Sequence, residues 1–186
     1  MYKRQVKDEC KDAIKKAKRA GINVIMITGD NTITAVAIAN KLDLFEESNV
    51  YKRSQSYAND SHPNTVFTGQ QWSKISEDKK MKILKNAMTN KKSMVFARTS
   101  PDNKRELVKM LKQCGEVVAM TGDGVNDAAA LKQASIGIAM GLNGTDVAKE
   151  ASDLVLLDDN FSTIVNAIEE GRSIYSNMKA LSLIHI

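Results

Sequence analysis

Apolar residues along the chain follow two patterns, helical spacing and short continuous runs. Helical spacing, together with helix start and stop signals, predicts helices over residues 8–20, 32–42, 77–88, 101–113, 128–133 and 161–180. Short apolar runs of the kind buried in parallel sheets predict strands at 23–27, 93–97, 116–120, 136–139 and 154–157. Because strands and helices alternate, the sequence predicts an α/β fold, a Rossmann-like parallel sheet with helices on both faces.

The segment 43–76 interrupts this alternation. It is polar and irregular, contains His62 followed by Pro63, and carries a few strand-forming residues at Thr65–Thr68. We expect this segment to be an excursion over the surface, because it lacks the regular periodicity of the other elements.

Polar residues of chemical interest follow the first three of the strands just described. In chain order they are Thr28, Gly29, Asp30, Arg98, Lys104, Asp123 and Asp127. In open parallel sheets, ligands bind at the carboxyl ends of the strands. We therefore expect these side chains to contribute to one site, and this convergence carries more weight than any single motif.

The run after the third strand carries two carboxylates four positions apart, Asp123 and Asp127. Gly122 and Gly124 flank the first of them and allow the backbone to turn sharply at the strand end. Mg²⁺ takes hard oxygen ligands, usually one or two from protein, with water and phosphate completing its shell. The run therefore favours a Mg²⁺ site. The alternative is an ordinary Gly-Asp turn in which Asp127 caps the following helix.

The loop after the first strand is suited to phosphate. Thr28 offers a hydroxyl group and Gly29 an exposed backbone N–H at the start of a helix. Lys104 could neutralise phosphate charge as a point cation. The alternatives are a simple helix cap at Thr28 and an ordinary surface lysine at position 104.

Composition narrows the class of protein. Hydrophobic residues make up 42% and charged residues 26%, and 27 Lys and Arg against 22 Asp and Glu give a net charge of +5. The basic residues are spread through predicted helices without interleaved aromatics, which favours solvated faces and no nucleic-acid partner. Cys10 and Cys114 match no metal-ligand spacing and fit a reducing compartment. No apolar run in the sequence is long enough to cross a bilayer.

Longer strings around these residues resemble P-type ATPases, which belong to the haloacid-dehalogenase-like superfamily. The strings that carry this resemblance are Met26–Asn31, Ala97–Arg98 with Pro101 and Lys104, Met120–Asp127, and Asp158–Phe161. Further strings resemble the calcium pumps of the sarco/endoplasmic reticulum type, namely Gly137–Gly141, Gly144–Thr145, Val147–Lys149 and Glu169–Tyr175. The resemblance covers about residues 6–180. It implies a haloacid-dehalogenase-like fold and an ATP-driven pump for cations, with Ca²⁺ as the expected ion.

The resemblance also implies a role for each residue around a Mg²⁺ cofactor. Asp123 would be the direct Mg²⁺ ligand, and Asp127 would hold Lys104 and a metal-bound water. The catalytic set would then be Lys104, Thr28 and Asp127, acting by positioning and electrostatics.

The remaining implied roles concern phosphate and the substrate ATP. Thr28 and Gly29 would bind the transferred phosphoryl group, and Asn126 would also face it. Asp30 and Arg98 would lie near the nucleotide.

The aspartate that these pumps phosphorylate is not in this sequence. It belongs to an Asp-Lys-Thr-Gly-Thr motif on a central strand, which in this family lies upstream, before the nucleotide-binding domain. The segment Asp30–Thr34 has a similar Asp-x-Thr-x-Thr spacing but lacks the Lys and the Gly. We therefore expect the sheet to lack the strand that carries the nucleophile and to leave an open apolar edge.

The resemblance divides the chain into parts. Residues 6–160 would form the C-terminal part of a phosphorylation domain, and 161–180 a stalk helix leading to the membrane. Residues 1–5 and 181–186 depart from the family pattern and would be foreign tails. The expected partners are the remainder of the pump, namely its nucleotide-binding, actuator and transmembrane domains. The chain would then lie at the cytoplasmic face of a membrane, with the endoplasmic reticulum as one candidate.

Two other functions are compatible with these motifs. A free-standing haloacid-dehalogenase-like phosphatase would need its own nucleophile, usually in an Asp-x-Asp motif, and the sequence contains none. A non-catalytic remnant that binds Mg²⁺ or nucleotide would keep the metal site without becoming phosphorylated. We expect the isolated chain to show no ATP hydrolysis.

Overall fold

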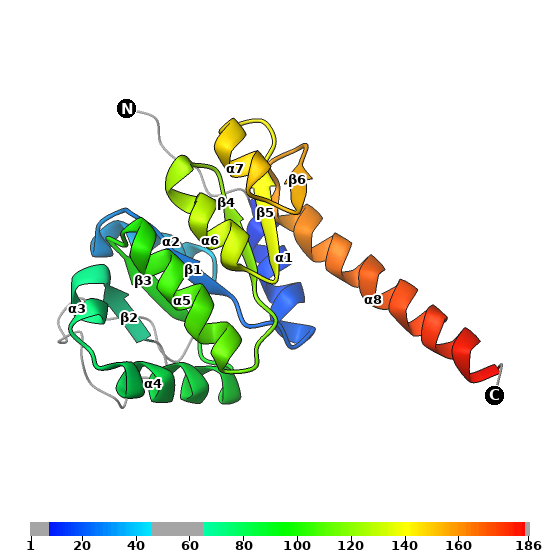
Figure 1. The fold of residues 1–186 in the computed structure, drawn as a ribbon, viewed down its shortest axis with the longest axis horizontal. Helices are drawn as coiled ribbons and strands as arrows, with labels where there is room; N and C mark the ends of the chain where they lie inside the picture. Colours follow the sequence, from blue (N-terminus) through cyan, green and yellow to red (C-terminus); the bar gives the residue numbers. More distant parts are fainter. Residues whose placement is uncertain (1–7, 46–64, 185–186) are drawn as a thin grey trace.

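The structure, a computed structural model, describes residues 8–45 and 65–184 (Figure 1). The predicted tail 1–5 and the pair His62 and Pro63 lie outside these residues. The strands are β1 Ile25–Ile27, β2 Thr65–Thr68, β3 Met94–Ala97, β4 Ala119–Gly122, β5 Ile136–Met140 and β6 Leu154–Leu156. The helices are α1 Asp8–Arg19, α2 Thr32–Lys41, α3 Gly69–Ser73, α4 Glu77–Thr89, α5 Pro101–Gln113, α6 Ala128–Gln133, α7 Asp146–Glu150 and α8 Phe161–Ile184.

The strands form two parallel sheets of three strands each, in the orders β1-β3-β2 and β4-β5-β6. In the first sheet Met26 lies opposite Val95, and in the second Thr121 lies opposite Ile138. Among the described residues, β1 and β4 each pair with a neighbour on one side only. The predicted α/β class with parallel strands is confirmed. Where the sequence predicted one sheet, the structure has two, and β1 and β4 are each an edge strand among the described residues.

Helices cover both faces of the first sheet. On one face α1 and α2 bury Ile14, Val36 and Ala39 against Val66 and Val95. The other face is covered by α3, α4 and α5. Its buried residues are Phe67, Trp72, Leu84, Ala87, Met94, Phe96, Leu107, Met110 and Leu111.

The second sheet is also covered on both faces. Val108 of α5, Leu131 of α6 and Ala148 of α7 pack with Met120 and Ala139 on one face. On the other face, Ile164 at the start of α8 packs with Ile138 and Leu156. Since α5 contributes to the core of both sheets, it joins the two halves of the fold.

The prediction of a surface excursion is wrong for residues 65–73. Strand β2 pairs with β3 along its whole length, and Trp72 of α3 is 1% exposed. Its ring lies edge-on to Phe67 and Phe96, with centroids 5.1 and 5.0 Å away. The strand is short, and it is stabilised by pairing with β3 and by aromatic packing. Neither interaction leaves a periodic pattern in the sequence, so the sequence pattern did not predict that this segment is buried.

The last helix continues four residues beyond its predicted end, to Ile184. Its first turns pack on the domain, and Lys16 of α1 forms an ion pair of 2.5 Å with Glu169. From Glu169 to Ala180 every residue is exposed, and the helix projects away from the body of the fold (Figure 1). None of the helices in the described part of the chain is both long and apolar enough to span a bilayer.

Candidate functional site

The loop after β1 carries the first group of predicted residues. The Thr28 amide donates to the Phe96 carbonyl (2.8 Å), and the Thr28 hydroxyl accepts from the Asp30 amide (3.1 Å). Helix α2 is capped instead by Asn31, whose side chain accepts from the Thr34 amide (2.9 Å). The alternative that Thr28 is the cap of this helix is therefore wrong, while Gly29 lies exposed in the loop.

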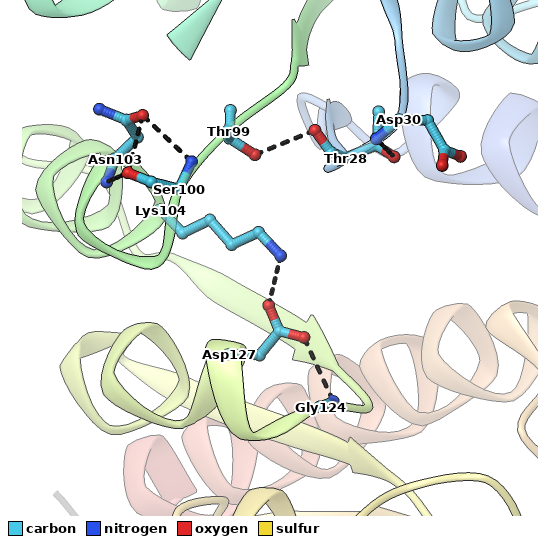
Figure 2. A network of polar contacts seen from close by, with 8 residues as sticks. All are labelled: Thr28, Asp30, Thr99, Ser100, Asn103, Lys104, Gly124 and Asp127. Atoms are coloured by element: carbon cyan, nitrogen blue, oxygen red, sulfur yellow. Dashed lines mark hydrogen bonds and ion pairs between the residues drawn. The ribbon is translucent and has the colours of Figure 1, made fainter.

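The turn after β3 holds this loop in place (Figure 2). Arg98 is exposed and adopts a left-handed backbone with φ of 49°, and its amide donates to the Asp30 carbonyl (2.9 Å). Thr99 donates to the Thr28 carbonyl through both its amide (3.2 Å) and its hydroxyl (3.0 Å). Ser100 then begins α5 with a capping box that includes Asn103. The ends of β1 and β3 are thus bound to each other.

The shortest polar contact in the site joins Lys104 and Asp127. The Lys104 Nζ lies 2.6 Å from the Asp127 Oδ1, and the two side chains are only 15% and 8% exposed. The other oxygen, Oδ2, accepts from the Gly124 amide (3.3 Å). The surface-lysine alternative is therefore wrong. Asp127 does stand at the start of α6, but its side chain makes no capping hydrogen bond there.

Asp123 is the carboxylate with room for a metal ion. It is exposed in the turn after β4, and no group of the described residues hydrogen-bonds its carboxylate, while its carbonyl accepts from the Thr145 amide (2.9 Å). One direct carboxylate fits Mg²⁺, which takes most ligands from water and phosphate. Both oxygens of Asp127 already have partners, which are the Lys104 Nζ and the Gly124 amide. In the described ranges, no three His, Cys, Asp or Glu side chains cluster as metal ligands.

The structure thus gathers the predicted residues at one edge of the fold. Figure 2 shows Thr28 and Asp30 on the β1 side and Lys104 reaching from α5 to Asp127 and Gly124 on the β4 side. Asn126 lies exposed in the short 3-10 turn Val125–Asp127. The roles given to these residues stay predictions.

An open pocket of about 450 Å³ adjoins the β1 loop. Its lining residues are Asn31, Thr32, Ile33, Thr68, Gln71 and Arg98. Thr68 and Gln71 come from the segment predicted to be a surface excursion. They form a capping box, in which the Thr68 amide donates to Gln71 Oε1 (2.9 Å) and the Gln71 amide to the Thr68 hydroxyl (3.2 Å). The Thr-x-x-Gln pattern was the available sequence signal for this helix start.

Comparison with known proteins assigns the family. Two sequence profiles of haloacid dehalogenase-like hydrolases match, one over residues 2–68 and the other over 103–168. A calcium-transporting ATPase of Plasmodium falciparum is 53% identical over 90% of the chain, and the endoplasmic reticulum-type calcium-transporting ATPase 2 of Arabidopsis thaliana is 51% identical over 94%. The chain belongs to the P-type ATPase family. The predicted resemblance is thereby confirmed.

The relatives are named for different transported ions, and each of them is much longer than this chain. The sodium/potassium-transporting ATPase subunit alpha-3 of Oreochromis mossambicus is 44% identical over 90% of the chain. The chain spans 13%, 15% and 17% of these three relatives. Among solved structures, the catalytic domain of the CPx-ATPase CopB-B is 25% identical with a TM-score of 0.57, over 87% of this chain and 45% of that one.

Proposed function

We propose that this chain is the part of an ATP-driven cation pump that supplies the Mg²⁺ and phosphate site of its phosphorylation domain. The observation that carries the proposal is the polar network at the strand ends, in which the buried pair Lys104–Asp127 faces the loop of Thr28 and Asp30. Phosphoryl transfer depends mainly on positioned charges and hydrogen-bond donors, and this edge offers both.

In this proposal Asp123 binds Mg²⁺ directly, and Asp127 keeps the Lys104 ammonium group at the site. Mg²⁺ supplies neutralisation of the charge on the phosphoryl oxygens. Thr28 and Gly29 offer a hydroxyl and a backbone N–H to that group.

The nucleotide would lie beyond the phosphate. Asn126 faces the phosphoryl group from the β4 side. Asp30 and Arg98 contact the rest of ATP, for which the pocket beside Arg98 offers space.

The nucleophilic aspartate lies outside this sequence and would enter on a strand between β1 and β4. Each of these strands pairs on one side only within the described residues. Ile27 at the end of β1 and Val118 just before β4 both pack against the core cluster of the first sheet and against that of the second. Helix α5 contributes to both clusters, so the edge strands β1 and β4 lie over the same helix. A further parallel strand there would place its carboxyl end next to Thr28 and Asp127.

Ca²⁺ is the proposed ion because the calcium-transporting relatives have identities of 45–53%, against 44% for the sodium/potassium-transporting ones. The rest of the pump, with its nucleotide-binding, actuator and transmembrane domains, would be the partner and would hold the chain at the cytoplasmic face of a membrane. Helix α8 would lead toward that membrane as the stalk.

A chimera tests this function. Residues 6–180 would replace the matching segment of the Arabidopsis thaliana relative, which is 51% identical. We expect Mg²⁺-dependent formation of an acyl phosphate from ATP, loss of it in Asp123→Asn, and no ATP hydrolysis by the isolated chain. A membrane-inserted chimera that forms no acyl phosphate, or an Asp123→Asn chimera that forms it normally, would contradict the proposal.

A further inference from the structure

The turn that carries Asp123 is held from outside by a second loop, residues 141–145. The amide of Thr145 donates to the Asp123 carbonyl (2.9 Å). Thr145 is also the cap of α7, where its hydroxyl accepts from the Ala148 amide (3.3 Å). The backbone of Asp123 therefore has a fixed partner 22 positions further along the chain, outside its own turn.

A carboxylate from a third segment binds this second loop. The Asp159 Oδ1 accepts from the Leu142 amide (3.1 Å), and its Oδ2 accepts from the amide and the side-chain nitrogen of Asn143, both at 2.8 Å. Hydrogen bonds to an ionised acceptor are stronger than those between neutral groups. Asp159 itself has a left-handed backbone with φ of 48°, which is unfavourable for a residue with a Cβ and persists where surrounding contacts fix it.

The second loop folds back closely on β5. A Cβ at Gly144 would lie 1.9 Å from the Met140 carbonyl oxygen, so no side chain fits there. At the other end of the loop, the Gly141 amide donates to the Leu156 carbonyl (2.7 Å). Between these two points, the Asp159 carboxylate accepts hydrogen bonds from the backbone amides of Leu142 and Asn143.

We infer that Asp159 is a positioning residue for Asp123. By fixing the backbone at Leu142 and Asn143, Asp159 keeps the Thr145 amide on the Asp123 carbonyl and thus sets the direction of the Asp123 side chain. The inference rests on the proposed role of Asp123 as the Mg²⁺ ligand. It concerns a residue that does not itself reach the metal or the phosphate.

The test uses amide hydrogen exchange in the purified, isotope-labelled chain. The variant is Asp159→Asn, and the matched control is Asp158→Asn, because Asp158 accepts instead from Asn160 and Thr163 at the start of α8. We expect exchange at the Thr145 amide to be about tenfold faster in Asp159→Asn and to change by less than about twofold in Asp158→Asn. Equal rates at Thr145 in both variants would overturn the inference.

A Mg²⁺ titration, followed at the amides of Gly122 and Gly124, separates this inference from the proposed function. Asp159→Asn should raise the dissociation constant by roughly three- to tenfold, and Asp123→Asn should abolish the response. Binding that survives Asp123→Asn would contradict the proposed function, and exchange at Thr145 would still decide the role of Asp159. Should Asp159→Asn not fold, Asn143→Ala removes one of its bonds, and unchanged exchange at Thr145 in that variant would overturn the inference.

Discussion

Lys104 and Asp127 form an ion pair that joins helix α5 to the turn after β4. The Lys104 Nζ lies 2.6 Å from the Asp127 Oδ1, and both side chains are more than four-fifths buried. Lys104 belongs to α5, whose Leu107 packs in the core of the first sheet, whereas Asp127 follows the first strand of the second sheet. The lysine that the proposed site uses for phosphate is therefore also held by a buried ion pair with the turn after β4.

Removing one member of this pair should destabilise the chain. Lys104→Met leaves the Asp127 carboxylate without its cation, and we expect the free energy of unfolding to fall by roughly 2–3 kcal/mol. Adding Asp127→Asn to that variant should restore part of the loss, because no buried charge is then left unpaired. Urea denaturation measures both effects.

An exposed pair is the matched control for Lys104. The side chains of Lys16 and Glu169 are 49% and 60% exposed, so Lys16→Met should cost less than about 1 kcal/mol. If Lys104→Met costs no more than Lys16→Met, the buried pair does not contribute as described.

Gly137 in β5 should tolerate no side chain. A Cβ there would lie 2.7 Å from the Leu131 carbonyl oxygen, which belongs to the backbone of α6. We expect Gly137→Ala to lower the free energy of unfolding by about 2–3 kcal/mol. Gly171→Ala is the control, since α8 is open there, and it should raise helix stability by about 0.5–1 kcal/mol. Thermal unfolding that ranks the two variants in the opposite order would contradict this packing.

The loop contact of Asp159 should make stability depend on pH. Partial burial raises the pKa of Asp159, but hydrogen bonds from the backbone of Leu142 and Asn143 and from the Asn143 side chain outweigh it, so the pKa is lowered overall. The unfolded chain then binds the proton more readily, so this contribution is present above the unfolded pKa and is lost as pH falls through the folded one. Below about pH 4, unfolding free energies of Asp159→Asn should therefore fall less steeply than those of the unmodified chain. If the unfolding free energies of the two proteins fall equally steeply with pH, the contact of Asp159 with the loop does not contribute as described.

Cys114 should react slowly with alkylating reagents. Burial at the end of α5 raises its pKa, the Lys85 charge lowers it, and Glu116 raises it again, with a net increase. Since the thiolate is the reactive form, iodoacetamide should modify Cys114 more slowly in the folded chain than in the denatured one at about pH 8. The measurement uses Cys10→Ser so that only one thiol is followed, and equal rates in the two states would contradict the effect of burial.

Local signals predicted several elements closely. Helix α5 has the predicted bounds, because Ser100, Pro101 and Asn103 specify its start within four residues. Strand β4 begins later than predicted, at Ala119, and continues to Gly122 because it pairs with β5 over that range. Helix α7 was not predicted, since its five residues carry little periodicity and its start is defined mainly by the Thr145 cap.

For the site, the sequence by itself determined which residues follow the strands and therefore which share one edge. Thr28, Lys104 and Asp123 could be selected in this way because chain order and parallel pairing place the ends of the strands together. The family resemblance already implied the contact of Lys104 with Asp127, which the structure confirms. Only the tertiary structure decided the contacts of Thr99 with Thr28 and of Asp159 with the loop beside Asp123. Helix and strand signals depend on neighbours within a few residues, whereas these contacts join residues 16 to 71 positions apart and are set by how α5, β3 and β5 pack.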